Sequence, residues 1–148
     1  MKVKHLILLT LPFAFTVAML SSCAEEKDDY VRPEFGNMKQ EPSPVKAGQM
    51  VTLTFPQTQK GNGIAGTTYE WKIKNIIVNQ LTGETKDSIL SVHTNYDGYG
   101  KQDPTLTFLV PENTIAKTYT VEMIASYSCY IGQVLFDESN QRGVLRVQ

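Results

Sequence analysis

The sequence predicts an all-β domain, an antiparallel β-sandwich of about seven short strands. Apolar and polar residues alternate over residues 50–55, 105–110 and 118–127, and this period of two is typical of strands with one buried face. Beyond the N-terminal leader, no segment shows a convincing helical period of apolar residues. The expected strands recur roughly every 10–15 residues, a spacing that favours a sandwich.

The chain begins with a segment typical of an export signal. Lys2, Lys4 and His5 form a basic start, and the mostly apolar residues 6–20 follow. Such a stretch is short for a membrane span and fits a secretory signal. We therefore expect residues 1–22 to be cleaved, which leaves 126 of the 148 residues (148 − 22).

The end of the signal resembles the lipobox of bacterial lipoproteins. Leu20-Ser21-Ser22-Cys23 has the aliphatic residue, the two small residues and the cysteine of that motif. The resemblance implies that the thiol of Cys23 carries a diacylglycerol and that its new amino group is acylated. Two or three acyl chains anchor a protein almost permanently. The alternatives are an uncleaved anchor, or an ordinary signal followed by a coincidental cysteine.

A charged segment follows the cysteine. Residues 24–30 are rich in Asp and Glu and contain one Lys, which is typical of a solvated tether. An acidic cluster at this place also resembles the surface-export signal of Bacteroidota-type lipoproteins, which implies the outer face of the outer membrane. Prolines disfavour a helix further along. We therefore expect a tether over residues 23–43 and a single sandwich domain over residues 44–148.

Each predicted strand has one face that should lie in the core. Residues 69–79, with Trp71 and Ile73 inward, and residues 87–94 should form a hairpin around a turn at 81–84. A short last strand is expected over residues 143–147. The other side chains expected inside are Val51, Leu53, Phe55, Leu106, Phe108, Val110, Tyr119, Val121, Met123, Ala125, Tyr127, Leu145 and Val147.

Three of these strands resemble strands B, C and F of immunoglobulin-like and PKD-like modules. The resemblance makes Trp71 the core tryptophan of strand C, and Tyr119 the corner tyrosine whose hydroxyl bonds back to the main chain. Val121 and Leu53 stand where antibody domains carry their disulfide, so this bridge is absent. The resemblance covers residues 44–148 and implies a fold, since such sandwiches host many unrelated functions.

Composition argues against several functions. The whole chain has 14 Lys and Arg against 15 Asp and Glu, and loss of Lys2 and Lys4 with the signal leaves 12 against 15. This balance excludes a concentrated basic face for nucleic acid. We expect Cys129 to be a small buried residue, with a reactive thiol as the alternative. His93, the one histidine after the signal, has no catalytic or zinc-binding pattern around it, so we expect neither an enzyme nor a cofactor.

One segment, residues 95–104, combines aromatic rings, oxygen donors and glycines. Its two tyrosines could stack on sugar rings while its Asn and Asp side chains bond sugar hydroxyls. The oxygens could instead bind Ca²⁺, although the spacing of a calcium loop is incomplete. The third interpretation is a solvent-exposed connection rich in turn formers. The candidate ligand-binding residues are Asn95, Tyr96, Asp97, Tyr99 and Asp103.

The sequence thus leads to two functional expectations. The first is a cell-surface lipoprotein, held in the outer membrane by its lipid, that binds a glycan or a protein without catalysis. The second is a structural or accessory subunit of a periplasmic or outer-membrane complex, with another protein meeting a strand edge.

Overall fold

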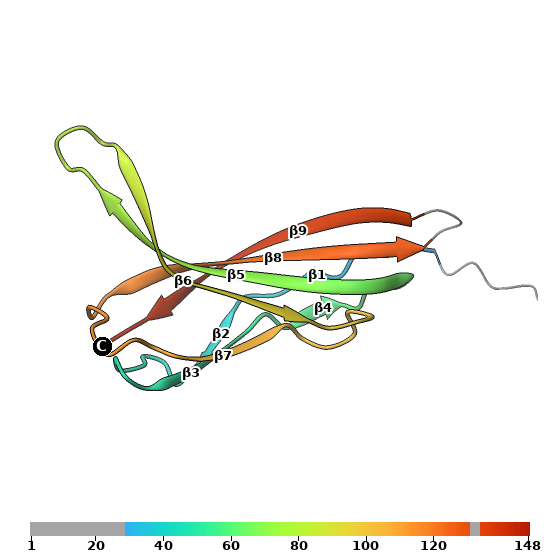
Figure 1. Ribbon diagram of the computed structural model, residues 1–148, viewed down its shortest axis with the longest axis horizontal. Coiled ribbons are helices and arrows are strands. Elements are labelled where there is room, and N and C mark those ends of the chain that lie inside the picture. The colour runs from blue at the N-terminus through green and yellow to red at the C-terminus, as the bar shows by residue number, and fades with distance from the viewer. Residues whose placement is uncertain (1–28, 131–133) are drawn as a thin grey trace, which may run out of the picture.

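A computed structural model describes residues 29–130 and 134–148 of the chain, so Cys23 and the acidic residues up to 28 lie outside the described residues. Within them the secondary structure consists of strands (Figure 1). No helix long and apolar enough to cross a membrane occurs in this part of the chain. The strands are β1 (Glu34–Phe35), β2 (Lys39–Glu41), β3 (Met50–Thr54), β4 (Gln57–Gln59), β5 (Ile64–Val78), β6 (Thr85–Tyr96), β7 (Thr105–Leu109), β8 (Thr118–Tyr130) and β9 (Val134–Arg146).

Two antiparallel sheets face each other across the core (Figure 1). One has the order β2-β3-β7, the other has the order β6-β5-β8-β9, and β1 pairs with β4 in a small ribbon. In the lettering of immunoglobulin domains, the first order corresponds to strands A, B and E and the second to C′, C, F and G. This strand order confirms the predicted immunoglobulin-like sandwich.

The core is built from the side chains that the alternation pattern assigned to it. Register pairs Trp71 with Met123 and Ile73 with Val121 across β5 and β8, so large side chains lie side by side on the inner face. All of the side chains expected inside are buried. At roughly 1.5–3 kcal/mol for each large apolar side chain, their burial is the main stabilising contribution.

Both features taken from the immunoglobulin resemblance are present. Trp71 is fully buried and packs on Phe55, with 5.7 Å between ring centroids. The hydroxyl of Tyr119 donates a hydrogen bond of 2.8 Å to the carbonyl of Ile115, four residues earlier, which is the tyrosine corner. Cys129 is also buried, as expected.

The sandwich extends into residues that we assigned to the tether. β1 and β2 lie within residues 34–41, where β2 pairs with β3 and β1 pairs with β4. The main chain already joins the domain at Val31, which exchanges two backbone hydrogen bonds of 3.0 Å with Asn62. These strands are only two and three residues long and lie between the prolines of the segment, so the sequence shows no alternation there.

A side-chain clamp holds this N-terminal segment on β9. Arg32 donates hydrogen bonds of 2.7 and 2.5 Å to the two carboxylate oxygens of Asp137, and the Tyr30 hydroxyl donates one of 2.6 Å. These bonds, from Arg32 first and then from Tyr30, lower the pKa of Asp137 to about 2. The carboxylate therefore remains charged and paired at neutral pH.

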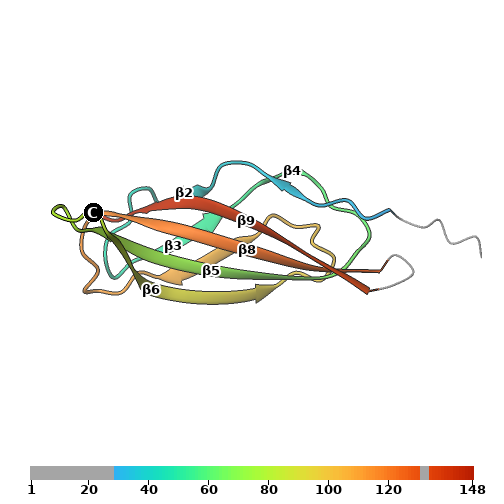
Figure 2. The ribbon, with the colours of Figure 1, turned by 90° about the horizontal axis from the view of Figure 1, so that it is seen from above.

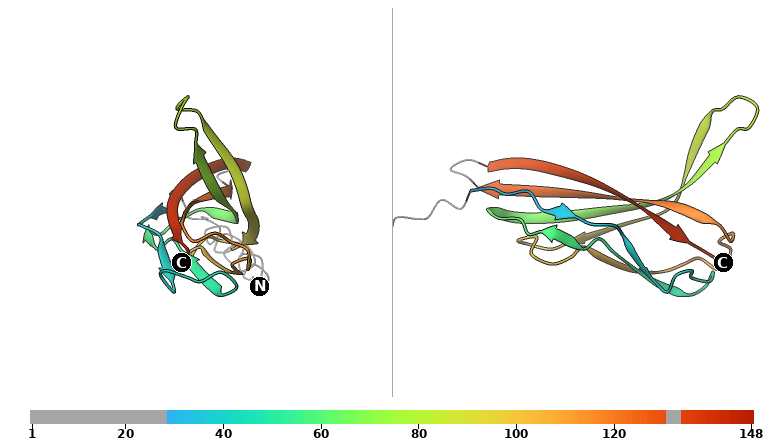
Figure 3. Two further views of the ribbon diagram at one scale, coloured as in Figure 1. Left: turned by 90° about the vertical axis from the view of Figure 1, so that its left-hand side faces the viewer. Right: turned by 180° about the vertical axis from the view of Figure 1, so that it is seen from behind.

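The β5–β6 hairpin leaves the body of the sandwich as a projecting arm (Figures 1 and 3). The β5–β6 register shifts between Ile73 and Lys74, and a bulge at such a point bends a strand. Beyond it, backbone hydrogen bonds of 2.8 Å from Asn79 to Glu84 and from Gly83 to Asn79 close the expected turn. The hairpin is longer than residues 69–94, because β5 begins at Ile64.

The tyrosine corner gives the first prediction. Substitution Tyr119→Phe should lower the free energy of unfolding by about 1 kcal/mol, because it removes one partly buried hydrogen bond and leaves the ring in place. Urea unfolding measures the change. Tyr99→Phe, at an exposed tyrosine, is the matched control and should change stability by less than about 0.5 kcal/mol. Equal stability of the two variants would contradict the assignment.

Candidate functional site

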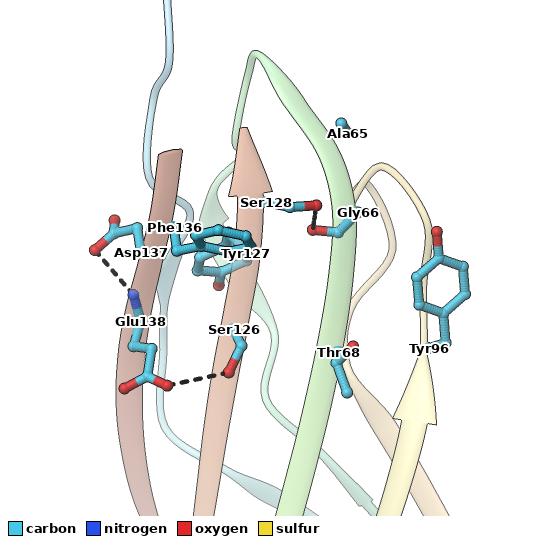
Figure 4. A pocket seen from close by; sticks show the side chains of 10 residues that line it. All are labelled: Ala65, Gly66, Thr68, Tyr96, Ser126, Tyr127, Ser128, Phe136, Asp137 and Glu138. Carbon is cyan, nitrogen blue, oxygen red and sulfur yellow. Dashed lines mark hydrogen bonds between the residues drawn. The ribbon is translucent and has the colours of Figure 1, made fainter. Parts of the chain in front are cut away.

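A shallow groove of about 540 Å³ lies on the open face of the four-stranded sheet (Figure 4). It crosses all four strands near the start of β5 and the end of β8. Tyr96 on β6 stands at one side, and Phe136 and Glu138 on β9 form the other side. Since neighbouring strands lie about 4.8 Å apart, the two edge strands are separated by roughly 14 Å.

Small side chains form the floor of this groove. Gly66, Thr68, Ser126 and Ser128 lie between the two aromatic residues. A Cβ atom on Gly66 would come within 2.7 Å of the Ser128 hydroxyl oxygen, so the glycine keeps the floor low. The sequence places small residues here on adjacent strands, and β-pairing brings them into one patch.

Polar groups in the floor are available to a ligand. The Ser126 hydroxyl is 3.4 Å from a carboxylate oxygen of Glu138, and the Ser128 hydroxyl is 3.4 Å from the carbonyl of Gly66. Hydrogen bonds of this length are weak, so exchange for bonds to a ligand costs little. Hydroxyls both donate and accept, whereas the ionised carboxylate only accepts.

The two aromatic side chains of the groove are strongly exposed. Tyr96 is 71% and Phe136 is 82% exposed, and β-alternation directs both to the open face. Large exposed aromatic rings on both sides of a polar floor are typical of a binding surface.

The structure separates the candidate residues of segment 95–104 into two groups. Asn95 accepts a hydrogen bond of 3.0 Å from the Trp71 indole and donates one of 3.2 Å to the carbonyl of Thr105. It therefore satisfies a buried donor and ties the loop to β7. This is a structural role, because loss of the acceptor would leave the indole N–H unpaired in the core.

The two aspartates of this segment also hold the loop together. Asp97 accepts hydrogen bonds of 3.4 Å from the Tyr69 hydroxyl and 3.3 Å from the backbone of Gln102. Asp103 accepts one of 2.9 Å from the backbone of Gln57 and a longer contact from Lys60. These contacts favour the structural interpretation of the oxygens over a ligand clamp. No cluster of three or more metal-ligating side chains occurs within residues 29–130 and 134–148.

The two tyrosines do not share a site. Tyr96 lines the groove, whereas Tyr99 is 69% exposed on the loop and is not among the groove residues. Gly98 and Gly100, both with positive φ, turn the chain between the sheet and the loop end. Of the five candidate residues, Tyr96 alone contributes to the groove.

Phe136, Glu138 and the serines of β8 were missed in the sequence. β9 begins at Val134 and not at residue 143, because pairing with β8 keeps the polar residues 137–142 extended despite their poor strand propensity. Ser126 and Ser128 belong to the strand predicted over residues 118–127 or its continuation. Their outward position follows from the inward position of Tyr127.

The two residues weighed for reactive chemistry lie in the sandwich itself. His93 packs on Phe108, with 4.9 Å between ring centroids, and lies 3.2 Å from the Ser91 hydroxyl. Burial lowers the pKa of His93 and raises the pKa of the Cys129 thiol. Both shifts favour the neutral form of the side chain.

No known family model matches the chain, and no curated protein sequence matches it. Among solved structures it is similar to the sporulation control protein Spo0M from Bacillus subtilis, at 15% sequence identity and a TM-score of 0.42. The likeness covers 80% of this chain and 50% of the other, so the chain spans half the length of that structure. A likeness of this degree carries no argument about function.

Burial of His93 gives a prediction about pH. Its pKa in the folded chain lies below the ordinary value of about 6.5, so the unfolded chain binds a proton more readily as the pH falls below about 6.5. The free energy of unfolding should therefore decrease between about pH 7.5 and about pH 5.5. Urea unfolding at both pH values measures this loss. His93→Gln, which cannot titrate, should reduce it, and an equal loss in the variant would assign the pH dependence to other groups.

Proposed function

We propose that the protein is a lipid-anchored, non-catalytic binding protein of the bacterial cell surface, whose sandwich holds a glycan in the groove between Tyr96 and Phe136. The observation that carries the proposal is the combination of two exposed aromatic rings with a floor of small hydroxyl-bearing residues. Sugar rings carry apolar C–H faces and polar edges. The groove offers a partner to each of these surfaces.

The width of the groove supports an elongated ligand. The aromatic residues stand on opposite edge strands, roughly 14 Å apart, and the hydroxyls lie between them. A single sugar ring cannot contact both aromatic residues at once, whereas a chain of several sugars can. We therefore favour an oligosaccharide or polysaccharide over a monosaccharide.

The anchor would keep this groove near the membrane. The groove lies near the start of β5 and the end of β8. These strand ends lie at the same end of the sandwich as the beginning of the described chain (Figure 3). Tyr30 is seven positions after Cys23, and an extended chain spans at most about 3.4 Å per residue, or about 24 Å in all. Glycans close to the membrane, such as those of lipopolysaccharide, are the ligands most easily reached.

The second candidate is a subunit of a periplasmic or outer-membrane protein complex. The observation that favours it is the projecting β5–β6 hairpin, which exposes Ile76, Ile77 and Leu81 at the end of the molecule opposite to the start of the described chain (Figures 2 and 3). Leu81, at the turn, is 97% exposed. A hairpin of this kind offers apolar contacts to a protein lying further from the membrane. If the protein is such a subunit, another protein should co-purify with it in a stoichiometric amount from detergent extracts.

Glycan binding is tested with a panel of immobilised lipopolysaccharide, peptidoglycan and neutral plant and bacterial polysaccharides. Tyr96→Ala and Phe136→Ala should each weaken binding at least about tenfold, since each removes one aromatic contact of roughly 1.5 kcal/mol. Tyr99→Ala is the matched control and should bind like the wild type. Loss of binding in Tyr99→Ala with normal binding in Tyr96→Ala would move the site to the loop. Absence of binding to every member of the panel would contradict a glycan ligand.

The anchor and the location are tested by protease treatment of intact cells. The wild-type domain should be digested from outside, whereas Cys23→Ala should not reach the surface, because it lacks the thiol that accepts the lipid. Immunoblotting of the whole chain measures the fraction that remains. Resistance of the wild type until the outer membrane is broken would place it in the periplasm and favour the subunit.

A further inference from the structure

β9 is an edge strand, since within the described residues β8 is the one strand of the sheet that it pairs with. Val147 donates a backbone hydrogen bond to Lys117, in register with β8, so odd-numbered residues at this end direct their N–H and C=O toward β8. Arg146 and Gln148 instead bond Gln40 and Val45, so even-numbered residues direct theirs away from β8. Along a regular strand this alternation places the main-chain groups of residues 136–144 with even numbers on the open edge.

Side chains of the same even-numbered residues lie on the open face. The odd-numbered Leu145 and Val147 are buried, whereas Phe136 and Val144 are 82% and 50% exposed. The side chain of Arg142 is 76% exposed, and its guanidinium lies 3.9 Å from a carboxylate oxygen of Glu122. Asn140 lies midway between Glu138 and Arg142, and midway between Phe136 and Val144. The edge is therefore self-complementary about Asn140, with an acid opposite a base and one apolar residue opposite another.

We propose that β9 pairs antiparallel with β9 of a second copy of this chain, across a two-fold axis at Asn140. In this register Glu138 of each copy faces Arg142 of the other, and Phe136 faces Val144. The facing residues are the ones whose main-chain groups point outward, so they form the hydrogen-bonded pairs of an antiparallel ladder. The N–H of Glu138 now donates a hydrogen bond of 2.9 Å to the Asp137 carboxylate, and in the dimer it would exchange this acceptor for the carbonyl of Arg142 in the other copy. The contact is isologous, because both copies use the same surface. The assembly stops at a dimer, because each β9 edge occupies the other.

Charge complementarity selects this edge and this occupant. Long strand edges are ordinarily shielded, because they pair readily with other strands. Apart from His93, the other outer strand of this sheet, β6, contains one base and one acid, Lys86 and Asp87. They are adjacent in sequence, and an antiparallel two-fold pairing joins residues separated by an even number of positions, so self-pairing there cannot place one opposite the other. On β9 the two-fold axis creates the same ion pair twice.

A groove lies beside part of the outer edge of β9. A groove of about 330 Å³ lies along β9, between residues 142–146 and the N-terminal segment at Asn37–Ser43. Gly143 lets Met38 pack closely under the strand, since a Cβ atom there would come within 2.6 Å of the Met38 sulfur. At Arg146 the side chain of Gln40 occupies both main-chain groups, so pairing ends before that residue.

The dimer would also complete the glycan groove from the partner copy. Val144 of the second copy would stand beside Phe136, at the side of the groove formed by β9. The pairing itself follows from the strand edge and does not depend on the identity of the ligand.

Cysteine cross-linking of the full-length chain in intact cells tests the register. A two-fold axis places residue 140 opposite itself, at a Cα separation of about 5.5 Å, which is within the range of a disulfide. Asn140→Cys should therefore give a cross-linked dimer under mild oxidation. Val144→Cys is the matched control and should give much less, because it faces Phe136. The wild type, in which Cys129 is the native thiol not used by the proposed lipid anchor, gives the background. No dimer with Asn140→Cys, or equal dimer with both variants, would overturn the proposal.

Charge reversal tests the ion pairs by sedimentation of the full-length chain in detergent. Arg142→Glu should weaken dimerisation at least about tenfold, because it places two like charges opposite each other on both sides of the axis. The double variant Glu138→Arg/Arg142→Glu should restore it. Arg146→Glu, on the same strand beyond the pairing, should have no effect. A monomeric wild type, or a double variant no better than Arg142→Glu while both remain folded by circular dichroism, would overturn the proposal.

Discussion

The packing of the two sheets against each other depends on the burial of Trp71 between them. Its ring packs on Phe55 of the facing sheet, and its indole N–H needs an acceptor in the core. Asn95 supplies this acceptor and also bonds the main chain of Thr105. One polar side chain therefore connects the centre of the core, the end of β6 and the beginning of β7, and a buried N–H without a partner would cost about 1–3 kcal/mol.

The inward position of Asn95 also determines which side chains lie on the open face of the four-stranded sheet. Because Asn95 points into the core, its neighbour Tyr96 must point outward, and alternation along β9 does the same for Phe136, next to the inward Asp137. The inner carboxylate is held by Arg32 and Tyr30, which fixes the strand on the side of the core. The exposed aromatic residues are consequently placed by the same contacts that stabilise the sandwich.

The sequence predicted the parts of the fold in which apolar residues alternate regularly. The inner faces of β3, β7 and β8 were correct, because burial of one face leaves a period of two in the sequence. The roles of the corner tyrosine and the core tryptophan followed from the resemblance to immunoglobulin-like modules. β1, β2 and the first half of β9 were missed. The first two are too short to show an alternation, and pairing with β8 holds the polar residues of β9 extended. Of the residues that line the groove, the sequence pattern singled out Tyr96 but not Phe136, since only strand pairing brings Phe136 to the same face.

Amide hydrogen exchange of the full-length protein, with and without the polysaccharide that binds it best, is the most direct test of the open-face site. We predict slower exchange in the ligand complex for residues 64–68, 126–128 and 136–138, with no change in residues 98–102. Slower exchange confined to residues 98–102, with the sheet residues unaffected, would contradict the account and assign binding to the loop.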